Sequence, residues 1–252
     1  MTATAKRTEW LQNMNIHMIN DPKKLHPHQQ LKFYTSIAML FVSLFIVVNL
    51  VTQKIVPIGG SLILTAGDFI YPLNYLLSMI LTEVYGYAMS RRVIWSSFVC
   101  NIFVALAIAI SIALPEAPSW HEQAQYTMIL GRTPRIFASS LGAFLVGEFI
   151  GTYILAKAKI FTSGKYLWFR TMGATLTGQA IDSIAFTAMA FAGIESWQNI
   201  LLLSFAAYGC KIVYQTLLTP VIYMLATFLK KREHIDIFDR NTDFNPFNLG
   251  LK

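Results

Sequence analysis

Charged residues are scarce in this sequence. Only 13% of its 252 residues are Asp, Glu, Lys or Arg, whereas a soluble domain carries about 25%. This shortage excludes a water-soluble monomer, a disordered chain and a solenoid with a polar surface. Cysteine is also rare. Cys100 and Cys210 both lie in apolar runs, which excludes a disulfide framework or a cysteine-based zinc site.

Nucleotide-binding and hydrolase motifs are missing as well. No P-loop precedes Gly164, and neither a G-x-S-x-G motif nor a dinucleotide-binding glycine pattern occurs. His121 and Glu122 begin like the zinc-protease motif, but Gln125 stands at the second histidine position. The sequence therefore predicts no enzyme, no cofactor and no metal site. Without an ATP site, active transport would need an ion gradient, a partner ATPase or trapping of the substrate.

Long apolar runs are what the sequence has instead, as expected when 55% of residues are hydrophobic. Each run reaches the ~20 residues that a helix needs to cross a ~30 Å hydrocarbon core, and backbone amides in lipid must pair internally. The predicted fold is an all-α membrane protein with a bundle of six transmembrane helices at residues 33–229, between tails at 1–32 and 230–252. The six runs are Phe33–Val51, Leu62–Ala88, Val93–Leu114, Ile136–Ala156, Trp168–Ala192 and Ile200–Leu229.

Basic residues predict the orientation of this bundle. With six spans, most of the 20 Lys and Arg residues fall in segments on the same side as both termini, and only Lys54 and Arg132 fall in the opposite loops. Cytoplasmic segments are enriched in Lys and Arg. Both termini are therefore predicted to be cytoplasmic in a multi-pass inner-membrane protein. The net charge of +7 is explained by these loops, so no nucleic-acid partner is expected.

Six charged residues lie within the apolar runs or directly at their ends, and a charge at membrane depth costs at least ~2.5–3.5 kcal/mol. Asp182 and Lys211 lie deepest, and they fit either a structural ion pair between the last two runs or a charge pair at the edge of a substrate cavity. An ionised Asp182 without a partner would be costly, so we expect Lys211 or Arg135 to pair with it before ligand arrives. The six are Asp68, Glu83, Arg135, Glu148, Asp182 and Lys211.

Two helical faces carry further polar residues. Spacings of three, four and seven place an amide, a carboxylate, a hydroxyl and an aromatic ring on one face of the fifth run, which suits a planar ligand rich in hydrogen-bond donors. The second run has a similar stripe, for which hydrogen bonding between helices is the favoured interpretation and ligand contact the other. The first face is Gln179, Asp182, Ser183 and Phe186, and the second is Tyr71, Asn74, Ser78, Thr82 and Tyr85.

Small residues also recur along one face of the fourth run, where they indicate helix packing. Ala143, Gly147 and Gly151 recur at intervals of four and predict close contact with a neighbouring helix.

Several blocks of this sequence resemble the queuosine precursor transporters, also called the vitamin-uptake-transporter family. The resemblance extends from about Leu40 to Phe247, and the G-Q-x-x-D-S and T-E-V-Y-G blocks are its most specific parts. The similar blocks are Phe69–Pro72, Leu81–Gly86, Ser90–Arg92, Arg170–Gly173, Gly178–Ser183, the region around Lys211, and Phe238–Phe247.

The resemblance implies an inner-membrane importer of six helices, similar in architecture to the substrate-binding subunits of energy-coupling-factor transporters. The implied substrate is a 7-deazaguanine precursor of queuosine used in tRNA modification, such as 7-cyano-7-deazaguanine, its aminomethyl form, or queuine. Family members commonly have an aspartate at the position of Met79, which leaves open the queuosine derivative that this chain takes. The predicted substrate-binding residues are Asp182, Gln179, Ser183, Phe186, Lys211, Glu83, Asn74, Tyr71, Arg135 and Glu148.

Two alternatives accompany this prediction. The chain could be the substrate-binding subunit of a transporter with a separate ATPase, or an intramembrane enzyme, for which few nucleophiles or metal ligands are present. The expected partners are a small deazapurine and the lipid bilayer. A homo-oligomer and coupling subunits both remain open.

Overall fold

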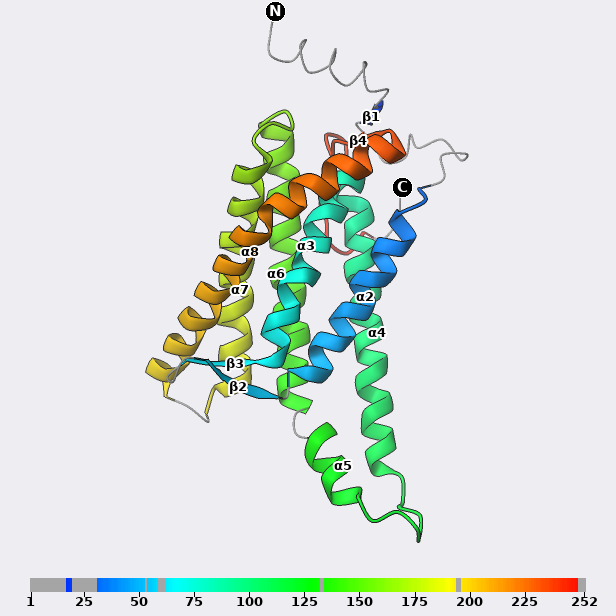
Figure 1. Cartoon of the computed structure of the whole chain (residues 1–252), viewed down its shortest axis with the longest axis vertical. Coiled ribbons are helices and arrows are strands. Elements are labelled where there is room, and N and C mark those ends of the chain that lie inside the picture. Colours follow the sequence, from blue (N-terminus) through cyan, green and yellow to red (C-terminus); the bar gives the residue numbers. More distant parts are fainter. Residues whose placement is uncertain are drawn as a thin grey trace, which may run out of the picture.

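The computed structural model describes residues 17–19, 31–52, 54–58, 62–131, 134–193 and 196–248. Most of the predicted N-terminal tail at 1–32 lies outside these ranges. Within them the chain forms seven helices and four short strands (Figure 1). In chain order these are β1 (His17–Ile19), α2 (Tyr34–Val51), β2 (Ile55–Ile58), β3 (Leu62–Thr65), α3 (Ala66–Tyr85), α4 (Tyr87–Ala113), α5 (Gln123–Leu130), α6 (Pro134–Phe161), α7 (Leu167–Phe191), α8 (Trp197–Glu233) and β4 (Ile235–Ile237).

The predicted helical character is confirmed: each apolar run contains one long helix. Four helical segments are long and apolar enough to cross a membrane, namely Tyr34–Val51, Tyr87–Ala113, Ala138–Phe161 and Trp197–Glu233. Their outer surfaces remain apolar, with Phe103 73% and Leu202 70% exposed. Surfaces of this kind belong in contact with lipid, so the chain is a helical membrane protein.

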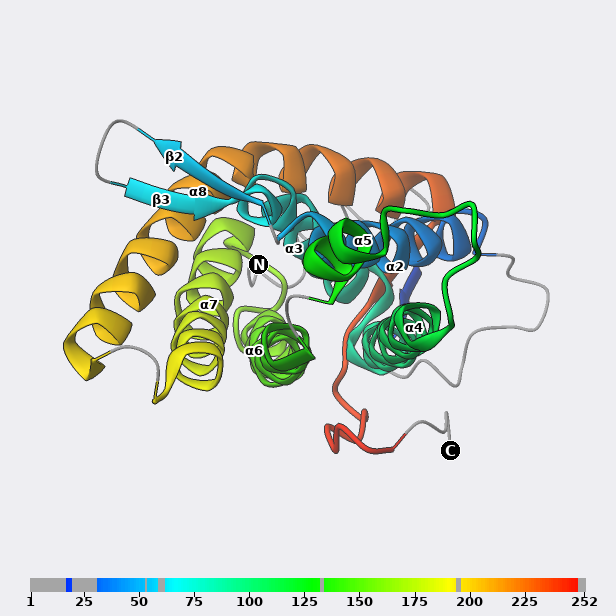
Figure 2. The ribbon, with the colours of Figure 1, turned by 90° about the horizontal axis from the view of Figure 1, so that it is seen from below.

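The two remaining long helices, α3 and α7, carry more polar residues and lie further inside. Viewed along the bundle, α3 lies between α8 on one side and α4 and α6 on the other (Figure 2). Almost every residue from Tyr71 to Tyr85 in α3 is buried. The polar stripe predicted for this segment therefore faces protein along its whole length.

The prediction of one helix across Leu62–Ala88 is wrong at both ends. Leu62–Thr65 pairs with Ile55–Ile58 as an antiparallel hairpin, and Asp68 then caps α3 by accepting hydrogen bonds from the backbone and the hydroxyl of Thr65 at 2.8 Å each. At the other end Gly86 has a φ of +81°, which ends α3. A Cβ there would lie 2.8 Å from Ile237.

A glycine ridge joins α6 to α7, and the contact between these two helices is the most extensive in the bundle. A Cβ on Gly147 would lie 2.8 Å from the Asp182 Cβ, and one on Gly151 would lie 2.8 Å from the Tyr75 hydroxyl. The close helix contact predicted from the small residues is confirmed. It brings the α6 backbone directly against Asp182.

The C-terminal segment packs onto the end of the bundle opposite the β2–β3 hairpin (Figure 1). Strand β4 pairs in parallel with β1, and the residues after it lie along α4. Asp239 accepts a hydrogen bond from the first backbone amide of α4, at Tyr87 (2.9 Å). Arg91 donates to the carbonyl groups of Asp243 (2.8 Å) and Asn245 (2.6 Å). These contacts fix the end of the chain against α4.

Candidate functional site

An ion pair lies between α7 and α8. The Lys211 Nζ is 2.5 Å from the Asp182 Oδ2, and the two side chains are only 12% and 7% exposed. The same Nζ lies 4.6 Å from the centre of the Tyr71 ring, in cation–π geometry. The prediction that Asp182 has a protein partner is confirmed, and Lys211 is that partner.

Several polar residues surround this ion pair. We call Tyr71, Asn74 and Ser78 of α3, Glu148 of α6, Gln179, Asp182 and Ser183 of α7, and Lys211 and Gln215 of α8 the Asp182 cluster. Helical periodicity places the members from each helix on one face. Gln179 lies next to the hydroxyl groups of Tyr71 and Tyr75. Four helices thus direct polar side chains toward one region.

Many polar atoms of the Asp182 cluster lack a hydrogen-bond partner. Among the residues that the structure describes, these buried atoms are Asn74 Oδ1 and Nδ2, Glu148 Oε1, Gln179 Oε1, Ser183 Oγ and Gln215 Nε2. Each such group costs about 1–3 kcal/mol when buried without a partner. They include both donors and acceptors. A polar ligand bound here would satisfy groups that the protein itself leaves unpaired.

Glu148 has an unusual position for a carboxyl group. It is 1% exposed and its Oε2 accepts a hydrogen bond from the Ser78 hydroxyl at 2.6 Å. Its neighbour Gly147 lies against Asp182. Within the described part of the chain, no Lys, Arg or His forms an ion pair with Glu148. The site therefore contains a second carboxyl close to the Asp182–Lys211 pair.

Two predicted binding residues, and the position at which the family resemblance implies an aspartate, lie apart from this cluster or outside the described residues. Phe186 is half-buried, one helical turn beyond Asp182, and no contact with the cluster is observed. The side chain of Arg135 lies outside the described residues. Met79, where relatives commonly have an aspartate, is fully buried in the apolar core of α3.

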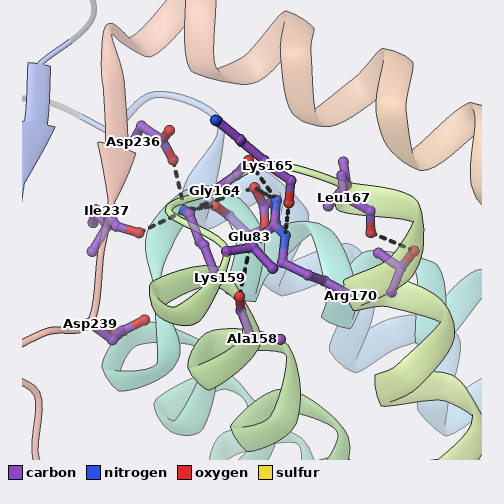
Figure 3. Close-up of polar contacts among 12 residues, drawn as sticks. Glu83, Ala158, Lys159, Gly164, Lys165, Leu167, Arg170, Asp236, Ile237 and Asp239 are labelled. Carbon is purple, nitrogen blue, oxygen red and sulfur yellow. Dashed lines mark hydrogen bonds and ion pairs between the residues drawn. The ribbon is translucent and has the colours of Figure 1, made fainter. Parts of the chain in front are cut away.

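Glu83 belongs to a separate cluster at the end of the bundle that β4 covers. Its carboxylate accepts hydrogen bonds from both terminal nitrogens of Arg170, at 2.5 and 3.2 Å, and from Lys230 at 2.6 Å. We call Glu83, Lys159, Arg170, Lys230 and Asp236 the Glu83 cluster. Figure 3 shows Lys159 and Arg170 converging on Glu83 from α6 and α7. The structure does not bring Glu83 to the Asp182 cluster.

The charges of the Glu83 cluster are compensated by one another and by the backbone. Lys159 and Lys230 lie 2.7 and 2.9 Å from the Asp236 Oδ1. Lys159 also donates to the carbonyl groups of Glu83 (2.5 Å) and Ile237 (2.7 Å). Burial raises the pKa of Asp236, but Lys159 and Lys230 outweigh burial and hold that pKa below its ordinary value. The cluster is thus a stable set of ions that joins α3, α6, α7, α8 and β4.

Sequence reasoning missed several of these residues. Gln215 lies four positions after Lys211 in an apolar helix, and that spacing was a usable signal. Lys159, Arg170 and Lys230 counted only as cytoplasmic loop charges, and Asp236 lies in a polar tail. Nothing in the sequence pattern indicated that these four would meet Glu83.

Comparisons with known proteins identify a transporter family. Residues 65–225 match the model of a family described as "Putative vitamin uptake transporter". The chain is 30% identical over 179 residues to the "Probable queuosine precursor transporter" of Bacillus subtilis (strain 168), which covers 69% of this chain and 76% of that protein. No solved structure matches the chain significantly. The matched range contains α3, α4, α5, α6, α7 and the part of α8 up to residue 225, and therefore all members of the Asp182 cluster.

Proposed function

Since the chain belongs to the vitamin uptake transporter family, we propose that it imports queuosine precursors across the cell inner membrane for tRNA modification. The substrate class is the 7-deazaguanines: 7-cyano-7-deazaguanine, its aminomethyl form, or queuine. The Asp182 cluster is the binding site. The observation that carries this proposal is the set of unpaired buried donors and acceptors around the Asp182–Lys211 pair.

The chemistry of a deazaguanine complements this set. Its Watson–Crick edge presents adjacent N–H donors, which a carboxylate such as Asp182 accepts in bidentate fashion. Its ring carbonyl accepts a hydrogen bond from Lys211, Asn74 or Gln215. Its flat ring needs an aromatic partner. Tyr71 is the candidate, because its ring already lies beside the Lys211 ammonium in a cation–π contact. Hydrogen bonds between the ligand and these polar atoms thereby remove the energetic penalty of leaving the atoms unpaired.

Six helices cross the membrane in this proposal: α2, α3, α4, α6, α7 and α8. The excess of Lys and Arg at the end with the Glu83 cluster supports cytoplasmic termini. A reporter fused after residue 252 tests this orientation. We expect activity from a reporter that works only in the cytoplasm. Activity from a reporter that works only in the periplasm would contradict the proposal.

The test of function uses cells that lack both precursor synthesis and their own importer. The chain is expressed alone, each deazaguanine is supplied separately, and queuosine is measured in isolated tRNA. We expect queuosine with the wild type and none with Asp182→Asn. Glu116→Gln, which removes an exposed loop carboxylate, is the control and is expected to retain uptake.

The same experiment separates this function from that of a substrate-binding subunit. Restored queuosine in a host without energy-coupling ATPase partners identifies an autonomous importer. Tight binding of deazaguanine by the purified chain, without uptake in that host, would instead indicate a subunit that depends on partners. If the chain shows no binding and no uptake, the proposed function is refuted.

A further inference from the structure

The protonation state of Glu148 follows from its surroundings. A buried carboxylate without a cation costs several kcal/mol, which the protein avoids by keeping the group neutral. Lys211, the cation of the Asp182 cluster, is engaged by Asp182 at 2.5 Å. Ser78 supplies one hydroxyl to Glu148, which does not compensate a full charge. These surroundings therefore favour the neutral carboxylic acid form of Glu148 as long as water does not reach it.

The described groups near Glu148 offer it no free cation, and the Asp182 carboxylate favours its neutral form. Tyr71 and Tyr75 of α3 and Asp182 of α7 lie close enough to interact with it electrostatically. Lys211 of α8 acts on it only through the ion pair with Asp182. Helix α4 also packs on α6, but its described residues bring no charge to Glu148. Two carboxyl groups that share one hollow do not both ionise readily.

A neutral Glu148 can donate a hydrogen bond, but no acceptor for it is found among the described residues. Its Oε2 is engaged with Ser78, whereas its Oε1 has no partner among the described residues. A protonated carboxyl in an apolar site donates a strong hydrogen bond to a carbonyl oxygen. Ionisation removes that donor and places a negative charge beside the ligand's carbonyl. Protonation of Glu148 and binding of a ring carbonyl are therefore coupled, and each strengthens the other.

From this coupling we infer that the chain is a proton symporter in which Glu148 carries the proton. This inference rests on the proposed function. In each cycle Glu148 takes one proton from the outer solution together with one deazaguanine. When the site opens to the cytoplasm and the ligand leaves, water reaches the carboxyl group, and Glu148 releases that proton to the cytoplasm before the empty site returns. Asp182 keeps a partner throughout, either Lys211 or the N–H groups of the ligand. The proton gradient then drives accumulation.

Binding to the purified chain tests the coupling directly. The probe is 7-cyano-7-deazaguanine, titrated between pH 6 and pH 8 in detergent. For coupling to one proton, the affinity of the wild type falls by up to tenfold per pH unit once Glu148 ionises. Glu148→Gln keeps a neutral donor at all pH values, so its affinity should not change with pH. Glu233→Gln, a half-buried carboxyl at the end of α8, should retain the wild-type pH dependence.

Transport in proteoliposomes tests the cycle. An inward proton gradient should accelerate wild-type uptake and drive accumulation, and an equal outward gradient should not. Glu148→Gln should exchange internal for external deazaguanine but fail to accumulate it. Wild-type uptake that ignores the proton gradient, or accumulation by Glu148→Gln equal to the wild type, would overturn the symport inference while leaving the proposed function intact. Absence of deazaguanine binding by the wild type would overturn both.

Discussion

The two buried charge clusters differ in how completely their polar groups are paired. In the Glu83 cluster, Glu83 receives three hydrogen bonds from Arg170 and Lys230, and Lys159 donates to two backbone carbonyl groups. In the Asp182 cluster one ion pair is formed, and the surrounding amides and hydroxyls of Asn74, Gln179 and Ser183 include atoms without partners. Complete pairing holds helices together, whereas incomplete pairing leaves polar groups that a ligand could satisfy.

The same four helices carry both clusters, so the difference does not come from the helices themselves. On α3, Asn74 and Glu83 are about 14 Å apart at about 1.5 Å per residue, and on α7, Asp182 and Arg170 are about 18 Å apart. The bundle is thus fixed by ions at one end and carries its binding groups toward the middle. This separation predicts that mutations in the first cluster affect folding and mutations in the second affect transport.

The largest effect is expected from Arg170→Met. The substitution leaves Glu83 buried without its bidentate partner, and breaking a buried ion pair costs about 3–5 kcal/mol. The measurement is the yield of monodisperse protein and the midpoint of thermal unfolding in detergent. A midpoint equal to that of the wild type would show that the Glu83 cluster does not hold the bundle together.

The double variant Asp182→Asn with Lys211→Met should give the opposite pattern. Because both charges are removed together, no unpaired ion remains, and the unfolding midpoint should stay near that of the wild type. Uptake should fall at least about 100-fold, equivalent to about 2.7 kcal/mol. Loss of folding with this variant, or retention of uptake, would contradict the assignment of folding to the Glu83 cluster and of transport to the Asp182 cluster.

Two glycines probe the packing behind Asp182. Gly147→Ala places a methyl group 2.8 Å from the Asp182 Cβ, so we expect destabilisation by about 1–3 kcal/mol together with reduced uptake. Gly173→Ala is the matched control on α7, because a Cβ there meets nothing within 4 Å. It should stabilise the helix by about 0.5–1 kcal/mol. Equal unfolding midpoints for the two variants would contradict the close approach of α6 to Asp182.

The smallest effect, and the finest distinction, concerns two buried asparagines. Asn74→Leu removes two unpaired polar atoms and should raise stability by about 1 kcal/mol while weakening deazaguanine binding. Asn49 instead bonds to Phe45, Asn101 and Ser140, so Asn49→Leu should lower stability by about 1–3 kcal/mol. Equal unfolding midpoints for both variants would show that hydrogen-bond pairing does not determine how much a buried asparagine contributes to stability.

Much of the Asp182 cluster, the proposed binding site, was predictable from sequence because its signal is local. The depth of Asp182 and Lys211 in apolar runs predicted their pairing, and helical spacing placed Gln179 and Ser183 beside Asp182. The Glu83 cluster was not predictable, since it depends on Asp236, which follows the whole of α8 and pairs with Lys159 and Lys230. Loop charges such as Lys159 also gave no sign of burial.

The errors in the fold have a similar cause. Hydrophobicity alone does not distinguish a short apolar strand from a helix, so the β3 strand at Leu62–Thr65 was taken as helix. The break at Gly86 depends on a positive φ and on the approach of Ile237 from the far end of the chain. Both features are set by tertiary contacts rather than by the local pattern.

Calorimetric titration of 7-cyano-7-deazaguanine into purified, folded protein is the most direct measurement of the central claim. The account predicts that the wild type binds one molecule per chain and that the equally folded double variant Asp182→Asn with Lys211→Met binds none. Undiminished binding by that variant would show that the ligand site lies elsewhere in the molecule.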